Sequence, residues 1–303
     1  MMDRSSAPGL ATPFPRPRDV LELLKPITWF PPIWAFLCGV VSSGVPLAER
    51  WPFLLAGVAL TGPLVCGTSQ AVNDWFDRDV DAINEPGRPI PSGRIAGRWG
   101  LGIACAGTLL SLLVAWATGP WVLAATIAAL ACAWAYSAPP FRLKASGWWG
   151  PAVVALTYEG LTWFTGASVM AGALPPTPVL IVLALYSLGA HGIMTLNDFK
   201  AVEGDRATGV RSLPVVLGVD GAARLACWVM ALPQVAVVVL LATWNHRLVA
   251  AVVAALLVGQ LLLMRRLLAD PRVHAPWYNA TGTTLYVLGM LAAALGLGGV
   301  MRL

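Results

Sequence analysis

Four aspartates within nine residues form the densest group of reactive side chains in the sequence. They belong to the segment NDWFDRDVD, which begins at Asn73 and contains Asp74, Asp77, Asp79 and Asp81. The chain around them is 57% hydrophobic and only 12% charged. Carboxylate and amide oxygens are ligands that Mg²⁺ prefers, and bound Mg²⁺ commonly bridges carboxylates to substrate phosphates. The segment therefore predicts a magnesium site for a phosphorylated substrate.

Helical geometry places most of these side chains on one face. At about 100° per residue, a single arc of roughly 100° contains Asn73, Asp74, Asp77 and Asp81. Asp79 points away from this arc. Carboxylates at such spacing repel one another unless a cation lies between them. The alternative interpretation is a solvated, frayed helix end that marks the membrane boundary.

A second copy of the pattern lies 124 positions further along, in the segment NDFKAVEGD. Its matching residues are Asn197, Asp198 and Asp205, while Ala201 stands at the position of Asp77. On a continuous helix these three side chains share an arc, and Glu203 points away. Marking a boundary would not require the same spacing twice, and an isolated intramembrane carboxylate costs about 2.5 to 3.5 kcal/mol. We therefore expect two repeats with a site between them.

Basic side chains occur in the polar loops that accompany both motifs. These residues are Arg88, Arg142, Lys144 and Arg211. They could bind an anion through charge-assisted hydrogen bonds, although each alone is also explained as a charge that orients the protein in the membrane. Acids for a metal and bases for an anion together predict a metal diphosphate substrate whose remainder is soluble in lipid.

The elements that must position these residues are membrane-spanning helices. The mean hydropathy of the chain is +0.71, and apolar runs long enough to cross about 30 Å of hydrocarbon recur throughout it. We predict an all-α membrane protein with about nine spans. They cover residues 27–47, 52–73, 99–118, 121–138, 149–171, 178–197, 222–243, 248–264 and 280–300.

The distribution of charge predicts how the chain is oriented. All but Arg50, Arg247 and Arg302 of the 20 Lys and Arg residues lie in the tail or in loops on one side, and such residues accumulate on the cytoplasmic side. The N-terminus is therefore expected to be cytoplasmic and the C-terminus to lie opposite. Orientation also explains the pI of about 9.2, so no nucleic-acid partner is expected. Residues 1–24 are predicted to be a disordered cytoplasmic tail, and residues 25–303 a single transmembrane domain.

Three composite motifs resemble the UbiA-type intramembrane prenyltransferases. They are NDWFDRDVDAINEPGRPIPSG, YSAPPFRLK and NDFKAVEGDRATGVRSLP. Within that superfamily, the continuations NEPGRPIPSG and EGDRATGVRSLP look like the branch of the chlorophyll and bacteriochlorophyll synthases. The resemblance covers nearly the whole chain after residue 20. It implies a bundle of nine transmembrane helices in two repeats around a central cavity.

The resemblance also implies the roles of individual residues. Mg²⁺ and the diphosphate would be held by Asn73, Asp74, Asp77, Asp81, Asn197, Asp198 and Asp205. The residues closest to catalysis would be Asp74, Asp77, Asp198 and Asp205, and the substrate contacts would include Arg88, Tyr136, Arg142, Lys144 and Arg211. Ala201 departs from a motif with three acids, so the second motif would ligate the metal less directly or through water.

For this branch, the resemblance implies that geranylgeranyl or phytyl diphosphate reacts with the propionate carboxylate of bacteriochlorophyllide a. The setting would be the inner or intracytoplasmic membrane of a photosynthetic bacterium. The choice of acceptor depends on TYEGLTWFTGAS and GAHGIMTLNDFK. Alternatives are a chlorophyllide acceptor, an aromatic or haem acceptor, or a secondary transporter, which also combines repeats with intramembrane polar groups.

Two further residues lie within predicted spans. Glu159 is predicted to line the cavity near the pigment or the allylic cation, and the alternative is a protonated packing residue with a hydrogen bond. His191 could ligate the central Mg²⁺ of the pigment, whereas a hydrogen-bonded histidine between helices is the alternative. Both are retained as substrate contacts.

Overall fold

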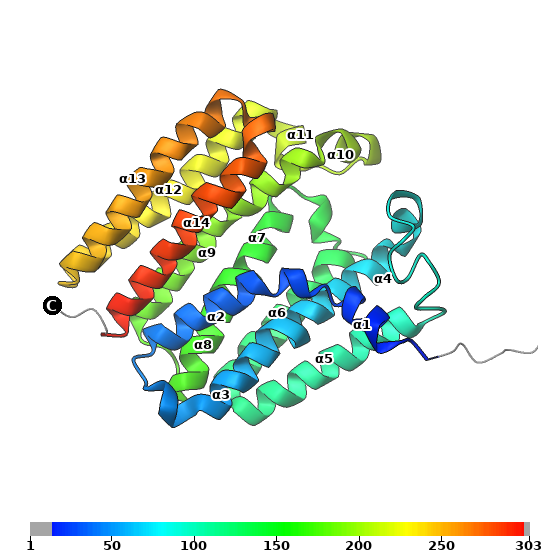
Figure 1. Cartoon of the computed structure of the whole chain (residues 1–303), viewed down its shortest axis with the longest axis horizontal. Coiled ribbons are helices and arrows are strands. Elements are labelled where there is room, and N and C mark those ends of the chain that lie inside the picture. The colour runs from blue at the N-terminus through cyan, green and yellow to red at the C-terminus, as the bar shows by residue number, and fades with distance from the viewer. Residues whose placement is uncertain (1–13, 300–303) are drawn as a thin grey trace, which may run out of the picture.

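The computed structural model describes residues 14–299, and these residues form a bundle of helices (Figure 1). The first motif lies in the half that contains α1 (Pro17–Leu23), η1 (Pro26–Thr28), α2 (Phe30–Ser42), α3 (Leu47–Ala59), η2 (Leu60–Cys66), α4 (Gly67–Asn84), α5 (Trp99–Thr118) and α6 (Pro120–Ser137). The short turn η3 (Leu143–Ala145) connects this half to the next.

The second motif lies in the remaining half of the bundle. Its elements are α7 (Trp149–Ala155), η4 (Leu156–Leu161), α8 (Thr162–Ala171), α9 (Thr177–Asn197), η5 (Asp198–Lys200), α10 (Val202–Thr208), α11 (Leu213–Leu217), α12 (Val219–Thr243), α13 (Arg247–Ala269) and α14 (Pro271–Leu297). The short helices α10 and α11 lie toward the same end of the bundle as the loop that follows α4 (Figure 1). Both motifs therefore lie toward the same end of the bundle.

The number of helices that can cross a membrane agrees roughly with the predicted nine. Within the described residues, seven helices are long and apolar enough, or eight if the bent pair Pro17–Thr28 and Phe30–Ser42 is counted as one span. The remaining predicted segment, residues 149–171, is helical as α7, η4 and α8. One candidate span extends from Leu47 to Asn84, with a kink at Arg50 and the π-helical stretch η2 within it, so the first motif continues a membrane helix.

The N-terminal segment differs from its prediction. Residues 1–13 of the expected tail lie outside the described residues, but Pro17–Leu23 forms helix α1 instead of a disordered chain. Leu23 is fully buried in a cluster with Val72 and Ile95. Asp19 accepts a hydrogen bond of 2.7 Å from Arg94. The Pro-rich composition predicted a disordered chain, but Pro at the start of a helix is compatible with helical geometry. The composition therefore gave no sign of these contacts.

Two glycines allow α2 and α8 to cross at backbone contact. A Cβ atom on Gly39 would collide with the carbonyl oxygen of Trp163, and one on Gly166 would collide with that of Phe36. Close approach through small residues is a common means of packing helices in membranes, where lipid supplies no hydrophobic driving force between them. The indole of Trp163 also donates a hydrogen bond of 3.0 Å to Ser42 Oγ across this interface.

We expect Gly166→Ala to destabilise the protein by about 1 to 3 kcal/mol, as overpacked cores do. The added methyl group must push α2 away from α8, because the atom it meets belongs to the backbone. Thermal unfolding in detergent measures the loss. Gly102→Ala is the matched control, since Gly102 is exposed and its Cβ would meet nothing closer than 4.0 Å. Equal melting temperatures for the two variants would contradict the close crossing.

Candidate active site

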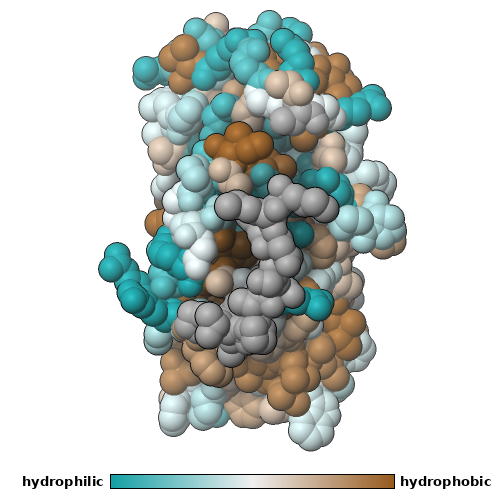
Figure 2. Space-filling view, turned by 90° about the vertical axis from the view of Figure 1, so that its right-hand side faces the viewer, coloured by the Kyte–Doolittle hydropathy of each residue, from teal (hydrophilic) through white to brown (hydrophobic). Residues whose placement is uncertain are grey.

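A cavity of about 420 Å³ lies between the two halves of the bundle. Its polar lining includes Asn73, Tyr136, Lys144, Asn197, Asp198 and Asp205. These residues come from both repeats, although the first motif contributes Asn73 and not its carboxylates Asp74, Asp77 and Asp81. Apolar side chains such as Val65, Ala129 and Val154 line much of the rest. Figure 2 shows a hollow with hydrophobic colour inside and a mixture of hydrophilic and hydrophobic residues around it.

Helix α4 holds the first motif on one face, which confirms that part of the sequence prediction. The α-helix is continuous from Gly67 to Asn84, so the spacing of its residues sets the direction of each side chain. Asp74 and Asp81 are 0% and 7% exposed. The side chain of Asp79 is 87% exposed. The carboxylates of one face are therefore turned into the protein, while Asp79 faces outward.

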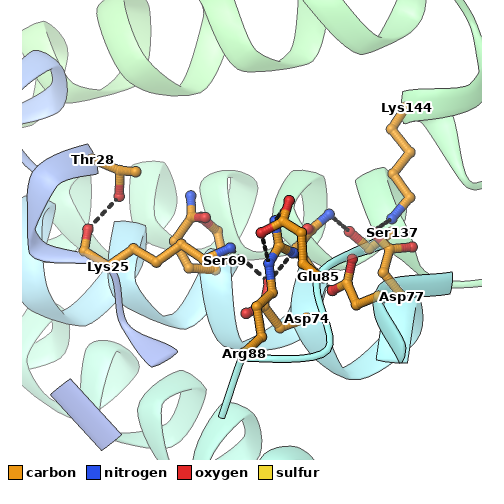
Figure 3. A network of polar contacts seen from close by, with 12 residues as sticks. Lys25, Thr28, Ser69, Asp74, Asp77, Glu85, Arg88, Ser137 and Lys144 are labelled. Carbon is orange, nitrogen blue, oxygen red and sulfur yellow. Dashed lines mark hydrogen bonds and ion pairs between the residues drawn. The ribbon is translucent and has the colours of Figure 1, made fainter. Parts of the chain in front are cut away.

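Arg88 connects two of these buried carboxylates. Its Nη1 atom lies 2.7 Å from Asp81 Oδ2 and 3.4 Å from Asp74 Oδ1. Its Nε atom donates to Glu85 at 2.6 Å (Figure 3). This hydrogen bond lowers the pKa of Glu85 from its ordinary value. The loop after α4 thus folds back, and its guanidinium neutralises the acidic face.

The loop between α6 and α7 supplies the partner of Asp77. Lys144 Nζ donates to Asp77 Oδ2, and Arg142 Nη2 lies 3.8 Å from Asp77 Oδ1. Burial lowers the pKa of Lys144 from its ordinary value, and the carboxylate of Asp77 opposes that shift. In Figure 3 the side chain of Lys144 points toward Asp77. The base predicted for the diphosphate therefore contacts an acid predicted for the metal.

The loop of the second motif runs beside the Lys144 loop. Gly147 N donates to Arg211 O at 2.8 Å, and Arg211 N donates to Ala145 O at 3.1 Å. The side chain of Arg211 is exposed. These backbone bonds bring the basic loops of the two repeats together at one end of the cavity.

The second motif does not form the continuous helical arc that its spacing predicts. Helix α9 ends at Asn197, and the turn η5 interrupts the path before α10 begins. Ala201 has φ −107° and ψ 2°, which is outside helical geometry. The prediction of a single arc is therefore wrong for this motif. Asn197, Asp198 and Asp205 nevertheless line the same cavity, because the chain folds back after the break.

The residues present fit a divalent metal ion whose coordination is completed by the substrate. Asp74 Oδ2 is buried and has no hydrogen-bond partner among the described residues. Across residues 14–299, no three His, Cys, Asp or Glu side chains form a ready metal cluster. Mg²⁺ is usually bound by one or two carboxylates, several waters and substrate phosphates, and needs no such cage. The free carboxylate oxygen fits this mode of binding.

Two further cavity residues belong to neither aspartate motif. Tyr158 and Gln70 both line the cavity. The hydroxyl of Tyr158 accepts a hydrogen bond of 3.3 Å from Gln70 Nε2 and lies 3.4 Å from Cys66 Sγ. Tyr158 lies in the π-helical turn η4 and Cys66 ends the π-helical turn η2. Such turns are rare and frequently occur at functional sites.

Glu159 and His191 lie outside the lining of this cavity. Glu159 is 5% exposed, and its Oε2 atom has no partner among the described residues. His191 borders a separate cleft of about 330 Å³ between η4, α8 and α9. Its Nε2 lies 3.2 Å from the carbonyl oxygen of Trp148, and its Nδ1 lies 3.4 Å from Thr195 Oγ1. These contacts favour a hydrogen-bonded histidine between helices over a pigment ligand.

Comparison with known proteins places this site in a family. The sequence pattern of the UbiA prenyltransferase family matches residues 28–289. The chain belongs to this family. As a UbiA prenyltransferase it is a multi-span membrane enzyme, and the pattern covers both aspartate motifs and every element from α2 to α13.

Relatives within the UbiA family include enzymes of pigment synthesis. The bacteriochlorophyll synthase 33 kDa chain of Cereibacter sphaeroides is 60% identical over 94% of this chain and 95% of its own. The chloroplastic chlorophyll synthase of Oryza sativa is 36% identical over 91% of this chain and 75% of its own.

A solved structure has the same fold. It is a UbiA homolog from Archaeoglobus fulgidus bound to GPP and Mg²⁺, with a TM-score of 0.71 and 20% identity over 90% of this chain and 99% of that one. The predicted UbiA-type fold is thereby confirmed.

Proposed function

We propose that this UbiA prenyltransferase esterifies the propionate carboxylate of bacteriochlorophyllide a with geranylgeranyl or phytyl diphosphate. The observation that carries the proposal is a cavity whose lining combines Asn73 of the first motif, Asp198 and Asp205 of the second motif and Lys144 with many apolar side chains. The identity of 60% to a bacteriochlorophyll synthase, against 36% to a chlorophyll synthase, favours the bacteriochlorin as acceptor. The membrane would be the inner or intracytoplasmic membrane of a bacterium, with the N-terminus cytoplasmic.

Within this proposal the two motifs would hold Mg²⁺ together with the diphosphate. Asp74 and Asp77 of the first motif, with Asp198 and Asp205 of the second, would hold the metal. Asn73, Asp81 and Asn197 complete the polar surroundings. A UbiA homolog of the same fold binds Mg²⁺ together with a prenyl diphosphate, which supports a divalent metal here. When bound, Mg²⁺ would act as a Lewis acid that stabilises the negative charge of the leaving diphosphate.

The chain's own cations assist the departure of the diphosphate. Lys144 borders the cavity, and Arg88 and Arg142 bind the neighbouring carboxylates. Fixed positive charges aimed at a developing anion stabilise the transition state without reorganisation. As the C–O bond breaks, the diphosphate keeps the bonding electron pair and the allylic carbon becomes cationic.

A propionate oxygen of the pigment then donates an electron pair to the allylic carbon and forms the ester. The carboxylate is ionised at neutral pH, so the step requires no strong general base. The apolar side chains of the cavity, including Val65, Ala129 and Val154, exclude water that would otherwise yield a free alcohol. Tyr136 borders the same space and would contact the substrate.

Purified protein in detergent, supplied with geranylgeranyl diphosphate and Mg²⁺, tests the proposal. We expect esterified pigment with bacteriochlorophyllide a, no ester without a divalent metal, and little ester with chlorophyllide a. Chromatography of the pigments measures all three results. Ester formed only from chlorophyllide would exclude the proposed acceptor, and product formed only from an aromatic or haem acceptor would exclude the whole pigment branch. Substrate flux into vesicles without chemical change would instead indicate a transporter.

A further inference from the structure

Lys25 lies at the start of the bundle in an unusual backbone conformation. It joins α1 to η1 with φ 47° and ψ 71°, in the left-handed region. Residues with a Cβ atom seldom occupy this region, and such strain concentrates at functional sites. From the sequence alone, Lys25 is only one of the many basic residues expected on the cytoplasmic side. The structure gives it a specific partner.

The ammonium group of Lys25 reaches into the first aspartate motif. Lys25 Nζ donates to Asp74 Oδ1 at 2.7 Å, and the side chain of Lys25 is only 24% exposed (Figure 3). Asp74 Oδ1 is also the atom that Arg88 approaches at 3.4 Å. The other carboxylate oxygen of Asp74 is buried without a partner among the described residues. Lys25 is therefore a counter-ion of the site, on the side opposite to Lys144.

Helix α1 is held in place by ion pairs that fix the position of Lys25. Arg94 Nη1 lies 2.7 Å from Asp19 Oδ1 and 2.6 Å from Glu22 Oε2. Arg94 belongs to the same loop as Arg88. This loop therefore supplies Arg88 to the first motif and also anchors α1, the helix that precedes Lys25. The loop after α4 therefore helps to place both Arg88 and Lys25 at the first motif.

The inward carboxylates of the first motif each have a basic partner in this arrangement. Lys25 binds Asp74, Lys144 binds Asp77, and Arg88 binds Asp81. A divalent metal that arrives alone must compete with these cations for the carboxylates. A diphosphate that arrives alone must compete with the carboxylates for the cations. When both bind together, the metal takes the carboxylates, and the diphosphate takes the cations that the carboxylates release.

We propose that Lys25 is an exchangeable counter-ion that holds Asp74 in the empty site and binds the diphosphate once a metal has taken Asp74. The inference deepens the proposed function and rests on it. It makes the binding of metal and diphosphate mutually favourable, which is a coupling free energy and must be reciprocal. Loss of the ammonium should therefore have effects of opposite sign on the two ligands.

Two binding measurements on the full-length protein in detergent test this assignment. Mn²⁺, a paramagnetic substitute for Mg²⁺, is titrated alone by electron paramagnetic resonance, and inorganic pyrophosphate is titrated calorimetrically at saturating Mn²⁺. For Lys25→Met we expect Mn²⁺ alone to bind about threefold more tightly, because a competing charge is removed. We expect pyrophosphate to bind about tenfold more weakly, because a charge-assisted hydrogen bond is lost.

Matched variants separate charge from backbone strain. Lys25→Gly removes the charge but accommodates the left-handed backbone, so it should reproduce both shifts of Lys25→Met. Lys25→Arg should restore most of the affinity for pyrophosphate. Arg18→Met removes an exposed cation of the same helix and should leave both affinities unchanged.

The outcomes distinguish this inference from the proposed function. Weaker Mn²⁺ binding in Lys25→Met would make Lys25 a fixed support of Asp74 and overturn the exchange. Unchanged pyrophosphate binding would overturn it as well. If the wild-type protein binds neither Mn²⁺ nor pyrophosphate, the metal diphosphate site of the proposed function itself fails.

Discussion

Asp77→Asn is expected to lower the rate of prenyl transfer by at least about 100-fold, the usual cost of losing one group that stabilises transition-state charge. Asp77 lies on the inward face of α4 and is bound by Lys144 and Arg142. The second motif has Ala201 at the equivalent position, so no carboxylate of the other repeat replaces it. Asparagine keeps the shape of the side chain and removes its charge, and the fold should therefore survive.

Asp79→Asn is the matched control for this result. It makes the same chemical change two residues away, on a side chain that is 87% exposed, and we expect activity close to that of the wild type. Steady-state rates of ester formation compare the two variants, and circular dichroism verifies the fold. Equal losses in both variants would mean that the face of α4 does not decide function. Full activity in Asp77→Asn would remove this residue from the metal site.

Arg88→Met is expected to impair both activity and stability. Removing one partner of a buried ion pair costs about 3 kcal/mol, because the remaining charge is left uncompensated. Here the carboxylates of Asp74 and Asp81 would both lose their guanidinium partner. We expect kcat/KM for the prenyl diphosphate to fall by about 100-fold or more, since a cation that stabilises the leaving group disappears as well.

Two substitutions provide the comparison for Arg88. Arg88→Lys keeps the charge but cannot form the forked contacts of a guanidinium, so activity should recover only in part. Arg98→Met removes an exposed arginine of the same loop and should change neither the melting temperature nor kcat/KM. A stable Arg88→Met protein with normal kcat/KM would show that the loop charge only orients the chain in the membrane.

The first motif could be predicted from the sequence because its helix is uninterrupted. Along α4, one angle per residue is enough to separate Asp77 from Asp79, and the structure keeps that geometry to Asn84. The same reasoning failed for the second motif, where the chain leaves helical geometry at Ala201. Nothing in NDFKAVEGD marks that break, since it contains neither Pro nor a well-placed turn signal.

The interior residues were harder to predict. Glu159 attracted notice as an acid within an apolar span, yet it is the neighbouring Tyr158 that lines the cavity. A π-helical turn contains one extra residue, which turns every later side chain by about 100° relative to an α-helix. Its presence depends on how neighbouring helices pack, and residue spacing alone cannot reveal it. The contacts of α1 were missed for a related reason, because Asp19 meets Arg94 only in the folded chain.

The glycine crossing of α2 and α8 also bears on how this bundle can move. These segments occupy corresponding positions in the two repeats, and Gly39 and Gly166 bring their backbones into contact. Alternating access requires one repeat to rock as a rigid body against the other along a surface that can slide. Because their backbones are in contact, α2 and α8 cannot slide past each other at this crossing. Admission of substrate and release of product are therefore expected to depend on the loops above the cavity, within a frame that stays fixed through the catalytic cycle.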